Sequence, residues 1–414
     1  MRFLLATSVA LSLGATRPAH GQHVHGAPAD TSASAPPMAS GTAWLPAAAP
    51  MRALHARLGG WELMVHGAAF VQYVREFGTR DAHQLGSVNW LMAVATHSLA
   101  GGVVGLRAMG SAEPFTLTGR GYPELLQVAV LYRGVTVSDR QHPHDLLAEA
   151  AVTYNRPIGG GVALSLYAAA IGEPALGPVA YSHRPSAAYD PTAPLGHHLQ
   201  DLTHISNGVV TVGASTRRVK IEGSAFNGAH GDDVWTDVDP IALNSYTGRI
   251  SVNPSAHWSI ATWVGHLAAV GGAHSHGALD RFGASVLHSR PVGRGEWSSA
   301  FVYGADLRDG ASHPLNSLLV ESTLELDRAN AVFARAEYVR RTAEDLALTG
   351  SIPEEVDIGA VAAGYARRVA TRARMEAVIG LRGTMRFVPA ELELFYGSRT
   401  PVGVLAYLEL RPAL

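Results

Sequence analysis

Apolar and polar side chains alternate at every second position through most of the chain after residue 60, and this pattern constrains the fold most. In the last such segment, one face carries Val402, Val404, Ala406, Leu408 and Leu410. The opposite face carries Tyr407, Glu409 and Arg411. Segments 219–226, 318–327 and 330–339 repeat the pattern. A period of two is typical of a β-strand with two different environments on its faces.

The breaks between these segments divide the chain into sixteen expected strands. They are placed at 61–76, 86–98, 103–113, 146–156, 162–171, 206–216, 218–227, 246–253, 257–267, 279–289, 296–306, 317–327, 330–340, 356–367, 374–386 and 401–411. Short connections alternate with long ones, of which 114–145 and 172–205 are the longest. Short turns on one side and long loops on the other are typical of bacterial outer-membrane barrels.

The N-terminus indicates export. Arg2 precedes a short apolar stretch, Phe3 to Leu13, and Ala19-His20-Gly21 offers small residues at a signal-peptidase site. The stretch is shorter than the about 20 residues that a membrane-spanning helix needs. Residues 1–21 are therefore predicted to be a cleaved signal peptide. Residues 22–60, rich in Ala, Pro, Ser and Gly, are predicted to be a disordered periplasmic tether.

Composition agrees with strands in lipid. Charged residues make up only 16% of the chain, below the about 25% of a typical soluble domain. We therefore expect residues 61–414 to form an all-β, transmembrane, antiparallel up-and-down β-barrel of about sixteen strands, with 14–18 allowed. Both termini would be periplasmic. The barrel would lie in the outer membrane of a Gram-negative cell, in contact with its lipid, after folding by the outer-membrane assembly machinery.

Two compositional features exclude classes of function. The chain has no Cys, which removes disulfides, thiolate metal sites and cysteine nucleophiles. Its 32 basic residues nearly balance its 34 acidic residues. A near-neutral chain without basic runs argues against a nucleic-acid partner.

Histidine is unusually frequent, with 20 residues, and it gathers in the two longest loops. Imidazole and carboxylate are ligands of zinc and copper. No cofactor is established by the sequence, but copper or zinc is the ion that such a group would take. The candidate metal ligands are His142, His144, Asp145, His183, His197, His198, Asp201 and His204. The alternative is that these side chains line a polar lumen or fix the loops to the wall.

Several stretches carry a resemblance to a known family. They are Gly41-Thr42-Ala43-Trp44-Leu45-Pro46, Asp139-Arg140-Gln141-His142-Pro143-His144-Asp145, Gly172-Glu173-Pro174-Ala175-Leu176-Gly177-Pro178 and the segment 204–213. From about residue 41 to its end, the chain resembles a family of exported bacterial proteins without an assigned activity. The resemblance implies a barrel fold. Some members have histidine-rich leaders and accompany metal-resistance genes, which implies a metal role.

Three functions remain open at this stage. The first is a porin-like channel for small solutes or ions, because about sixteen strands can enclose an aqueous lumen. The second is a barrel that binds, transports or confers resistance to copper or zinc, which would use the loop histidines and the leader His23-Val24-His25. The third is an outer-membrane hydrolase. No Ser/His/acid set can be assembled from the sequence, so we expect no enzymatic activity.

Overall fold

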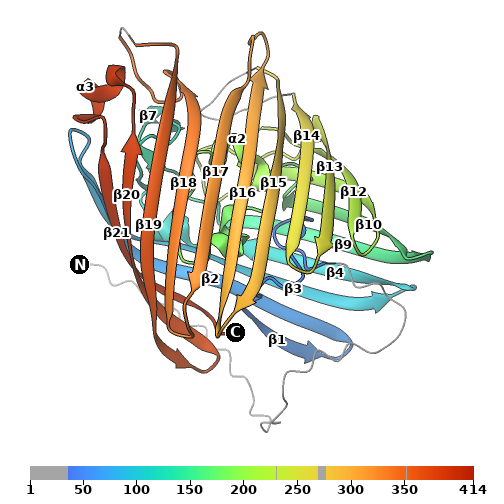
Figure 1. Ribbon diagram of the computed structural model, residues 1–414. Coiled ribbons are helices and arrows are strands. Elements are labelled where there is room, and N and C mark those ends of the chain that lie inside the picture. Colours follow the sequence, from blue (N-terminus) through green and yellow to red (C-terminus); the bar gives the residue numbers. More distant parts are fainter. Residues whose placement is uncertain (1–35, 230, 269–276, 351) are drawn as a thin grey trace, which may run out of the picture. The chain divides into compact units, whose positions relative to one another are not determined.

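The computed structural model describes residues 36–229, 231–268, 277–350 and 352–414. The predicted signal peptide and His23-Val24-His25 lie outside the described residues. One large antiparallel sheet dominates this part of the chain (Figure 1). Its strands are β1 (Ala53–Leu58), β2 (Trp61–Glu76), β3 (Ala82–Leu99), β4 (Gly102–Gly110), β9 (Leu147–Gly159), β10 (Val162–Gly172), β11 (Ser206–Ser215), β12 (Val219–Phe226), β13 (Ser245–Ser255), β14 (Trp258–Leu267), β15 (Leu279–Val292), β16 (Gly295–Arg308), β17 (Leu315–Glu325), β18 (Asn330–Thr342), β19 (Glu355–Arg372), β20 (Met375–Phe387) and β21 (Val402–Pro412).

The sheet closes on itself. Each strand from β2 to β21 pairs with the next strand of the sheet, and β21 returns to β2, with Leu410 opposite Ala69 and Gly403 opposite Glu76. The short β1 lies beside the first part of β2, with Ala53 opposite His66. The closed ring in the described residues therefore has sixteen strands. β1 is an additional short strand that pairs only with the first part of β2. The predicted antiparallel barrel of sixteen strands is confirmed, and all sixteen predicted ranges overlap their observed strands.

The connections are sorted by length between the two ends of the ring. Tight turns join strands at one end, as between β3 and β4, where Ala100 and Gly101 have φ of 49° and 74°. Gly adopts such positive φ without steric cost. The long connections 111–146 and 173–205 lie at the other end. The C-terminal strand ends on the short-turn side, because Pro412 pairs with Met375, the first residue of β20.

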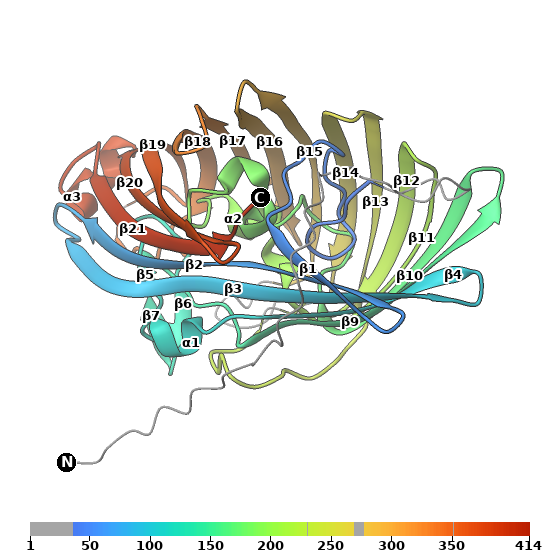
Figure 2. The ribbon, with the colours of Figure 1, turned by 90° about the horizontal axis from the view of Figure 1, so that it is seen from below.

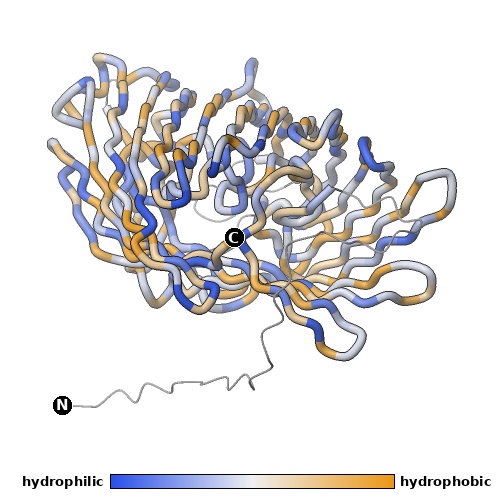
Figure 3. Tube along the Cα trace, turned by 60° about the horizontal axis from the view of Figure 1, so that its bottom comes forward, coloured by the Kyte–Doolittle hydropathy of each residue, from blue (hydrophilic) through white to orange (hydrophobic). Residues whose placement is uncertain are grey.

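The outward faces of the strands are apolar and exposed. In β21 exposed and buried residues alternate along nearly the whole strand, and the large exposed residues are Val402, Val404, Leu408 and Leu410. The other strands add side chains of the same kind, such as Leu91 and Val320. Figure 3 shows hydrophobic and hydrophilic positions alternating along the strands. In the described residues no helix is long and apolar enough to cross a membrane.

The inward faces are buried because loops occupy the lumen. Figure 2 shows α2 inside the ring of strands. Leu195 and Leu199, from the connection between β10 and β11 that carries α2, pack with Leu315, Val339 and Ile358 of the wall in one buried cluster. The connecting loops carry the short elements α1 (Glu113–Thr116), β5 (Tyr122–Pro123), β6 (Val130–Tyr132), β7 (Val135–Val137), β8 (Arg140–Gln141), η1 (Tyr181–His183), η2 (Pro185–Ala187), α2 (His197–Gln200), η3 (Leu202–His204), η4 (Ala390–Leu392) and α3 (Glu393–Tyr396).

Over residues 36–60 the structure contradicts the prediction of a disordered tether. Nearly all of 36–46 is buried, and strand β1 follows it. Inward side chains of the wall hold its backbone: Arg107 Nη2 donates to Ala39 O at 3.0 Å and Asn253 Nδ2 donates to Leu45 O at 2.8 Å. Small, polar and Pro-rich residues need no periodic pattern when the barrel wall supplies their hydrogen-bond partners.

Candidate functional site in the barrel lumen

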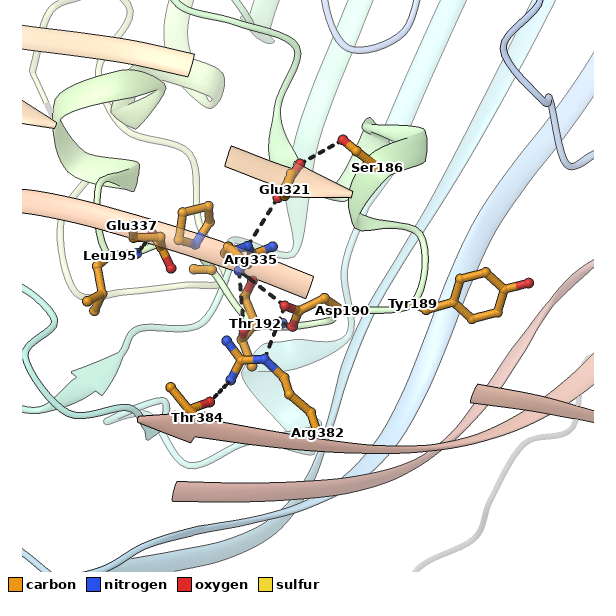
Figure 4. Close-up of polar contacts among 12 residues, drawn as sticks. Ser186, Tyr189, Asp190, Thr192, Leu195, Glu321, Arg335, Glu337, Arg382 and Thr384 are labelled. Carbon is orange, nitrogen blue, oxygen red and sulfur yellow. Dashed lines mark hydrogen bonds and ion pairs between the residues drawn. The ribbon is translucent and has the colours of Figure 1, made fainter. Parts of the chain in front are cut away.

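The loop between β10 and β11, residues 173–205, is fixed to strand β17 of the barrel wall by a buried carboxylate. Glu321 of β17 accepts hydrogen bonds from Arg184 Nε at 2.6 Å, from Ser186 Oγ at 2.8 Å and from Arg335 Nε at 3.1 Å. Figure 4 shows Glu321 between Ser186 of the loop and Arg335 of β18. Arg184 and Glu321 are each only 1% exposed. A charge buried to this degree requires a partner, and each of these groups has one.

A second carboxylate, Asp190, continues the network from the loop side. It lies 3.5 Å from Arg335 Nη1 and accepts a hydrogen bond from Arg382 Nε at 3.1 Å (Figure 4). Burial by itself raises the pKa of Asp190, but Arg335, Arg382 and hydrogen bonds from Thr192 lower that pKa below its usual value. Asp190 is therefore ionised at neutral pH. Two elements far apart in sequence are locked together by alternating charges.

The same pairing of inward arginines with carboxylates recurs around the wall. The pairs are Arg107 with Glu149, Arg249 with Glu222, Arg281 with Asp306, Arg386 with Glu76, and Arg411 with Glu376 and Glu409. All of these arginines are buried. The lumen is thus lined by charged groups that are paired with one another and with loop carbonyls.

The histidine-rich loops do meet inside the barrel. The ring centres of His197 and His204 are 5.0 Å apart, and those of His144 and His204 are 5.5 Å apart. His198 lies 5.4 Å from His197 and 5.7 Å from His142, measured between ring centres. We call these five residues, 142, 144, 197, 198 and 204, the histidine cluster. The two longest loops therefore converge, as the metal hypothesis requires.

Four rings of the histidine cluster are oriented through Nδ1, that of His142 by Pro143 O at 3.0 Å. His197 Nδ1 is 2.5 Å from Asp201 Oδ1, and His204 Nδ1 is 2.7 Å from the Asp201 carbonyl oxygen. His144 Nδ1 lies 3.0 Å from the carboxylate of Glu113. The Nε2 atoms of His197 and His204 are buried and have no hydrogen-bond partner among the described residues.

Protonation differs between two neighbours in the histidine cluster. Burial, followed by the charge of His197, lowers the pKa of His204 from 6.5 to about 3. Burial also acts to lower the pKa of His144, but the Glu113 carboxylate outweighs it, so that pKa lies above 6.5. His204 is therefore neutral at pH 7, with a lone pair available on its ring.

The other predicted ligands lie at different distances from the cluster. Asp201 orients His197 and His204, as described above. Asp145 lines a small cavity with His142, His144 and His204, and burial, with nearby acidic groups, raises the pKa of Asp145 to about 7. His183 instead faces Met109, with Nε2 3.3 Å from Sδ.

Over the described ranges, 36–229, 231–268, 277–350 and 352–414, no three or more His, Cys, Asp or Glu residues are grouped so that they could hold a metal ion. The histidine cluster is a chain of ring pairs rather than a closed set of ligands. Sequence reasoning missed Glu113, His66 and Met109, because each is a single residue without a neighbouring motif.

Beside these residues lies a cavity of about 140 Å³. Segments from distant parts of the chain line it, among them 39–40, 50–52, 66–68, 180–185 and the end of β21. The lining combines apolar groups with imidazoles, carboxylates and arginines. This cavity is larger than the one of about 20 Å³ that Asp145 lines with His142, His144 and His204.

Comparison with known proteins gives a fold but no family. No family model matches the chain, and no curated protein matches its sequence. The metal-resistance association implied by the resemblance therefore has no support from these comparisons.

Solved structures with a similar fold are outer-membrane porins. An anion-selective porin from Comamonas acidovorans is 13% identical over 85% of this chain and 99% of its own, with a TM-score of 0.51. OmpF from Salmonella typhi, in complex with daunomycin, is 8% identical over 86% of this chain and 100% of its own, also with a TM-score of 0.51. At these identities the likeness establishes the porin-type barrel fold.

Proposed function

We propose that this chain is a porin-like channel for small solutes or ions in the outer membrane of a Gram-negative cell. The observation that carries the proposal is a closed ring with exposed apolar side chains outside and charged side chains inside. Only a bilayer makes such an exterior favourable, and only a polar path makes such an interior useful. The similar fold of two porins supports the proposal.

The contents of the lumen limit what could pass. The loop 173–205 and the segment 36–51 occupy much of the interior, and the cavity that they leave measures about 140 Å³. We therefore propose that only small solutes or ions pass, and that large ones are excluded. Export by a cleaved signal peptide of residues 1–21, periplasmic termini and folding by the outer-membrane assembly machinery complete the proposal.

Conductance in planar bilayers tests the channel. The refolded mature protein should give discrete current steps that are small for a sixteen-strand barrel, because the lumen is narrowed. Folding is checked beforehand by gel electrophoresis, because a folded barrel migrates differently before and after heating. A folded barrel that never conducts would contradict the proposal.

A second candidate function, copper or zinc binding in the lumen, is favoured by the orientation of the histidine cluster. Metal-ligating histidines usually donate their second ring nitrogen to a carboxylate or carbonyl, which orients the ring. His197, His204 and His144 show that arrangement through Asp201 and Glu113. Binding would require ring rotations, because the described residues are not grouped as a ready set of metal ligands. The proposed ligands are the sequence-predicted residues except His183, which faces Met109 instead.

Zinc titration followed by calorimetry tests this candidate. His197→Gln should weaken zinc binding by about tenfold or more, the effect typical of altering a metal's ligand environment. His266→Gln is the control, because His266 lies on β14 and pairs with the exposed Asp280. Equal zinc affinity in both variants would remove the histidine cluster as a metal site. No observation favours the hydrolase alternative.

A further inference from the structure

Soft donor atoms gather in the 140 Å³ cavity. Its lining includes four imidazoles and two thioethers: His66, His144, His183, His204, Met51 and Met109. The chain has only 8 Met in 414 residues. Two of them face one small cavity together with imidazoles that come from strand β2 and from the two longest loops.

His183 and Met109 form the centre of this group. His183 Nε2 lies 3.3 Å from Met109 Sδ. Nitrogen and sulfur ligands lie about 2.0–2.1 Å and about 2.3 Å from a bound metal such as zinc. With those distances, one ion can contact both atoms at an angle of about 100°. The two atoms are already spaced as a pair of ligands would be.

His66 completes the group from the wall. Its ring centre is 5.6 Å from that of His183, and its Nε2 is buried without a hydrogen-bond partner among the described residues. His66 is only 7% exposed, and an unpaired polar atom at such depth costs free energy unless something binds it. Trp90 packs against both rings, with centres 5.1 Å from His66 and 4.3 Å from His183, and so keeps them in place.

We propose that His66, Met109 and His183 bind a monovalent soft metal ion, copper(I). Thioether sulfur selects copper(I) over harder ions, and imidazole is a second ligand type that copper accepts. Copper(I) also accepts low coordination numbers, which suits two imidazoles and one thioether. Five of the predicted zinc or copper ligands form the histidine cluster, and two of these, His144 and His204, line the same cavity without belonging to the proposed set.

The surrounding charges permit a cation. Arg107 of β4 is paired with Glu149, with Nε 3.1 Å from Oε1. The three arginines that line the cavity, Arg52, Arg184 and Arg411, are each paired with a buried carboxylate as well. Glu113 contributes a carboxyl group to the lining of the same cavity. A monovalent ion adds one charge to this setting, where a divalent ion would add two. The inference deepens the second candidate function, and it depends on the barrel but not on conductance.

Silver(I) and copper(I) binding to the detergent-solubilised protein tests the site. The parent protein should compete with a chromophoric copper(I) chelator, and silver(I) should bind by calorimetry. Met109→Leu keeps the volume but removes the sulfur, so it should weaken both ions by about tenfold or more. The control is Met385→Leu, because Met385 is 41% exposed on the outer face of β20.

X-ray absorption at the copper edge gives a second readout. The parent should show a sulfur neighbour, and Met109→Leu should lose it while its gel mobility shows a folded barrel. Unchanged affinity in Met109→Leu, or a loss of copper in His197→Gln but not in Met109→Leu, would overturn the inference. Bilayer conductance of the same samples is scored separately, so a conducting barrel that binds no soft ion contradicts this site and leaves the channel proposal standing.

Discussion

At the scale of single residues, the charged side chains of the lumen are buried and paired with opposite charges. Arg335 illustrates the arrangement, because it lies between Glu321 and Asp190 and also donates to Thr192 O at 2.9 Å. Removing one partner of a buried ion pair is far more costly than removing the pair. A more exposed pair, Arg340 of the same strand with Asp357, contributes little.

Arg335→Met should therefore destabilise the barrel by about 3–5 kcal/mol, because two buried carboxylates are left without their shared cation. Arg340→Met, on the same strand β18, should cost only about 0–1 kcal/mol. Urea unfolding of both variants in lipid vesicles, followed by tryptophan fluorescence, measures the difference. Equal losses in the two variants would show that the buried network does not fix the loop.

Glu173 gives a pH-dependent prediction at the same scale. Burial, opposed in part by Arg249, raises the pKa of Glu173 from 4.5 to about 8. Between about pH 4.5 and pH 8, Glu173 is therefore protonated in the folded protein and ionised in the unfolded chain. The free energy of unfolding falls as pH rises through this range. Glu173→Gln, which cannot ionise, should gain stability relative to the parent across that range and gain no more above it. Unfolding midpoints at several pH values test this, and a pH-independent difference would contradict it.

At the scale of elements, the segment 36–51 acts as a filling of the lumen rather than as part of the wall. Thr42 Oγ1 accepts a hydrogen bond from Arg249 Nη2 at 2.9 Å, and Trp44 O accepts one from Ser259 Oγ at 3.1 Å. The ring itself closes through β2 and β21 without this segment. The segment can therefore be removed without opening the sheet.

Deletion of residues 36–50 should raise the single-channel conductance, since water and ions would replace the segment beside Arg249. Removal of residues 310–312, in an exposed turn between β16 and β17, is the matched control and should leave conductance unchanged. Both proteins are compared in planar bilayers at the same salt concentration. If both deletion variants had the single-channel conductance of the parent protein, the segment 36–51 would not restrict the flow of ions.

At the scale of the whole molecule, the apolar exterior determines where the protein is stable. Leu408 lies near the middle of β21, is 39% exposed and pairs across the closing seam with Val71. Leu58 lies at the turn between β1 and β2, at the edge of the same surface. These two positions report on the depth of a bilayer around the ring.

Leu408→Arg should cost about 2–4 kcal/mol, as for a charge at the midplane of a bilayer, and Leu58→Arg about 0–1 kcal/mol, as near an interface. Guanidinium unfolding in lipid vesicles measures both. If Leu58→Arg cost as much as Leu408→Arg, the belt of lipid contact would have to lie elsewhere on the barrel.

The wall of this barrel follows from its sequence alone. Alternation along a strand is a local property, because each side chain points to the opposite face from its neighbour whatever the rest of the chain does. For that reason the range 61–76 was predicted with the bounds that β2 has, and Val402 to Leu410 were correctly placed on one face. Alternating short and long connections also place the two histidine-rich loops at the same end of the ring, but the contacts between their histidines come from the tertiary structure.

Only the tertiary structure decided what fills the barrel. Arg184 meets Glu321 across 137 positions of sequence, and Arg107 holds Ala39 across 68. His66 and Met109 lie on separate strands, and only the folded loop brings His183 against both of them. Contacts of this kind leave no local pattern, because the partner of each group is chosen by closure of the ring and not by the residues beside it.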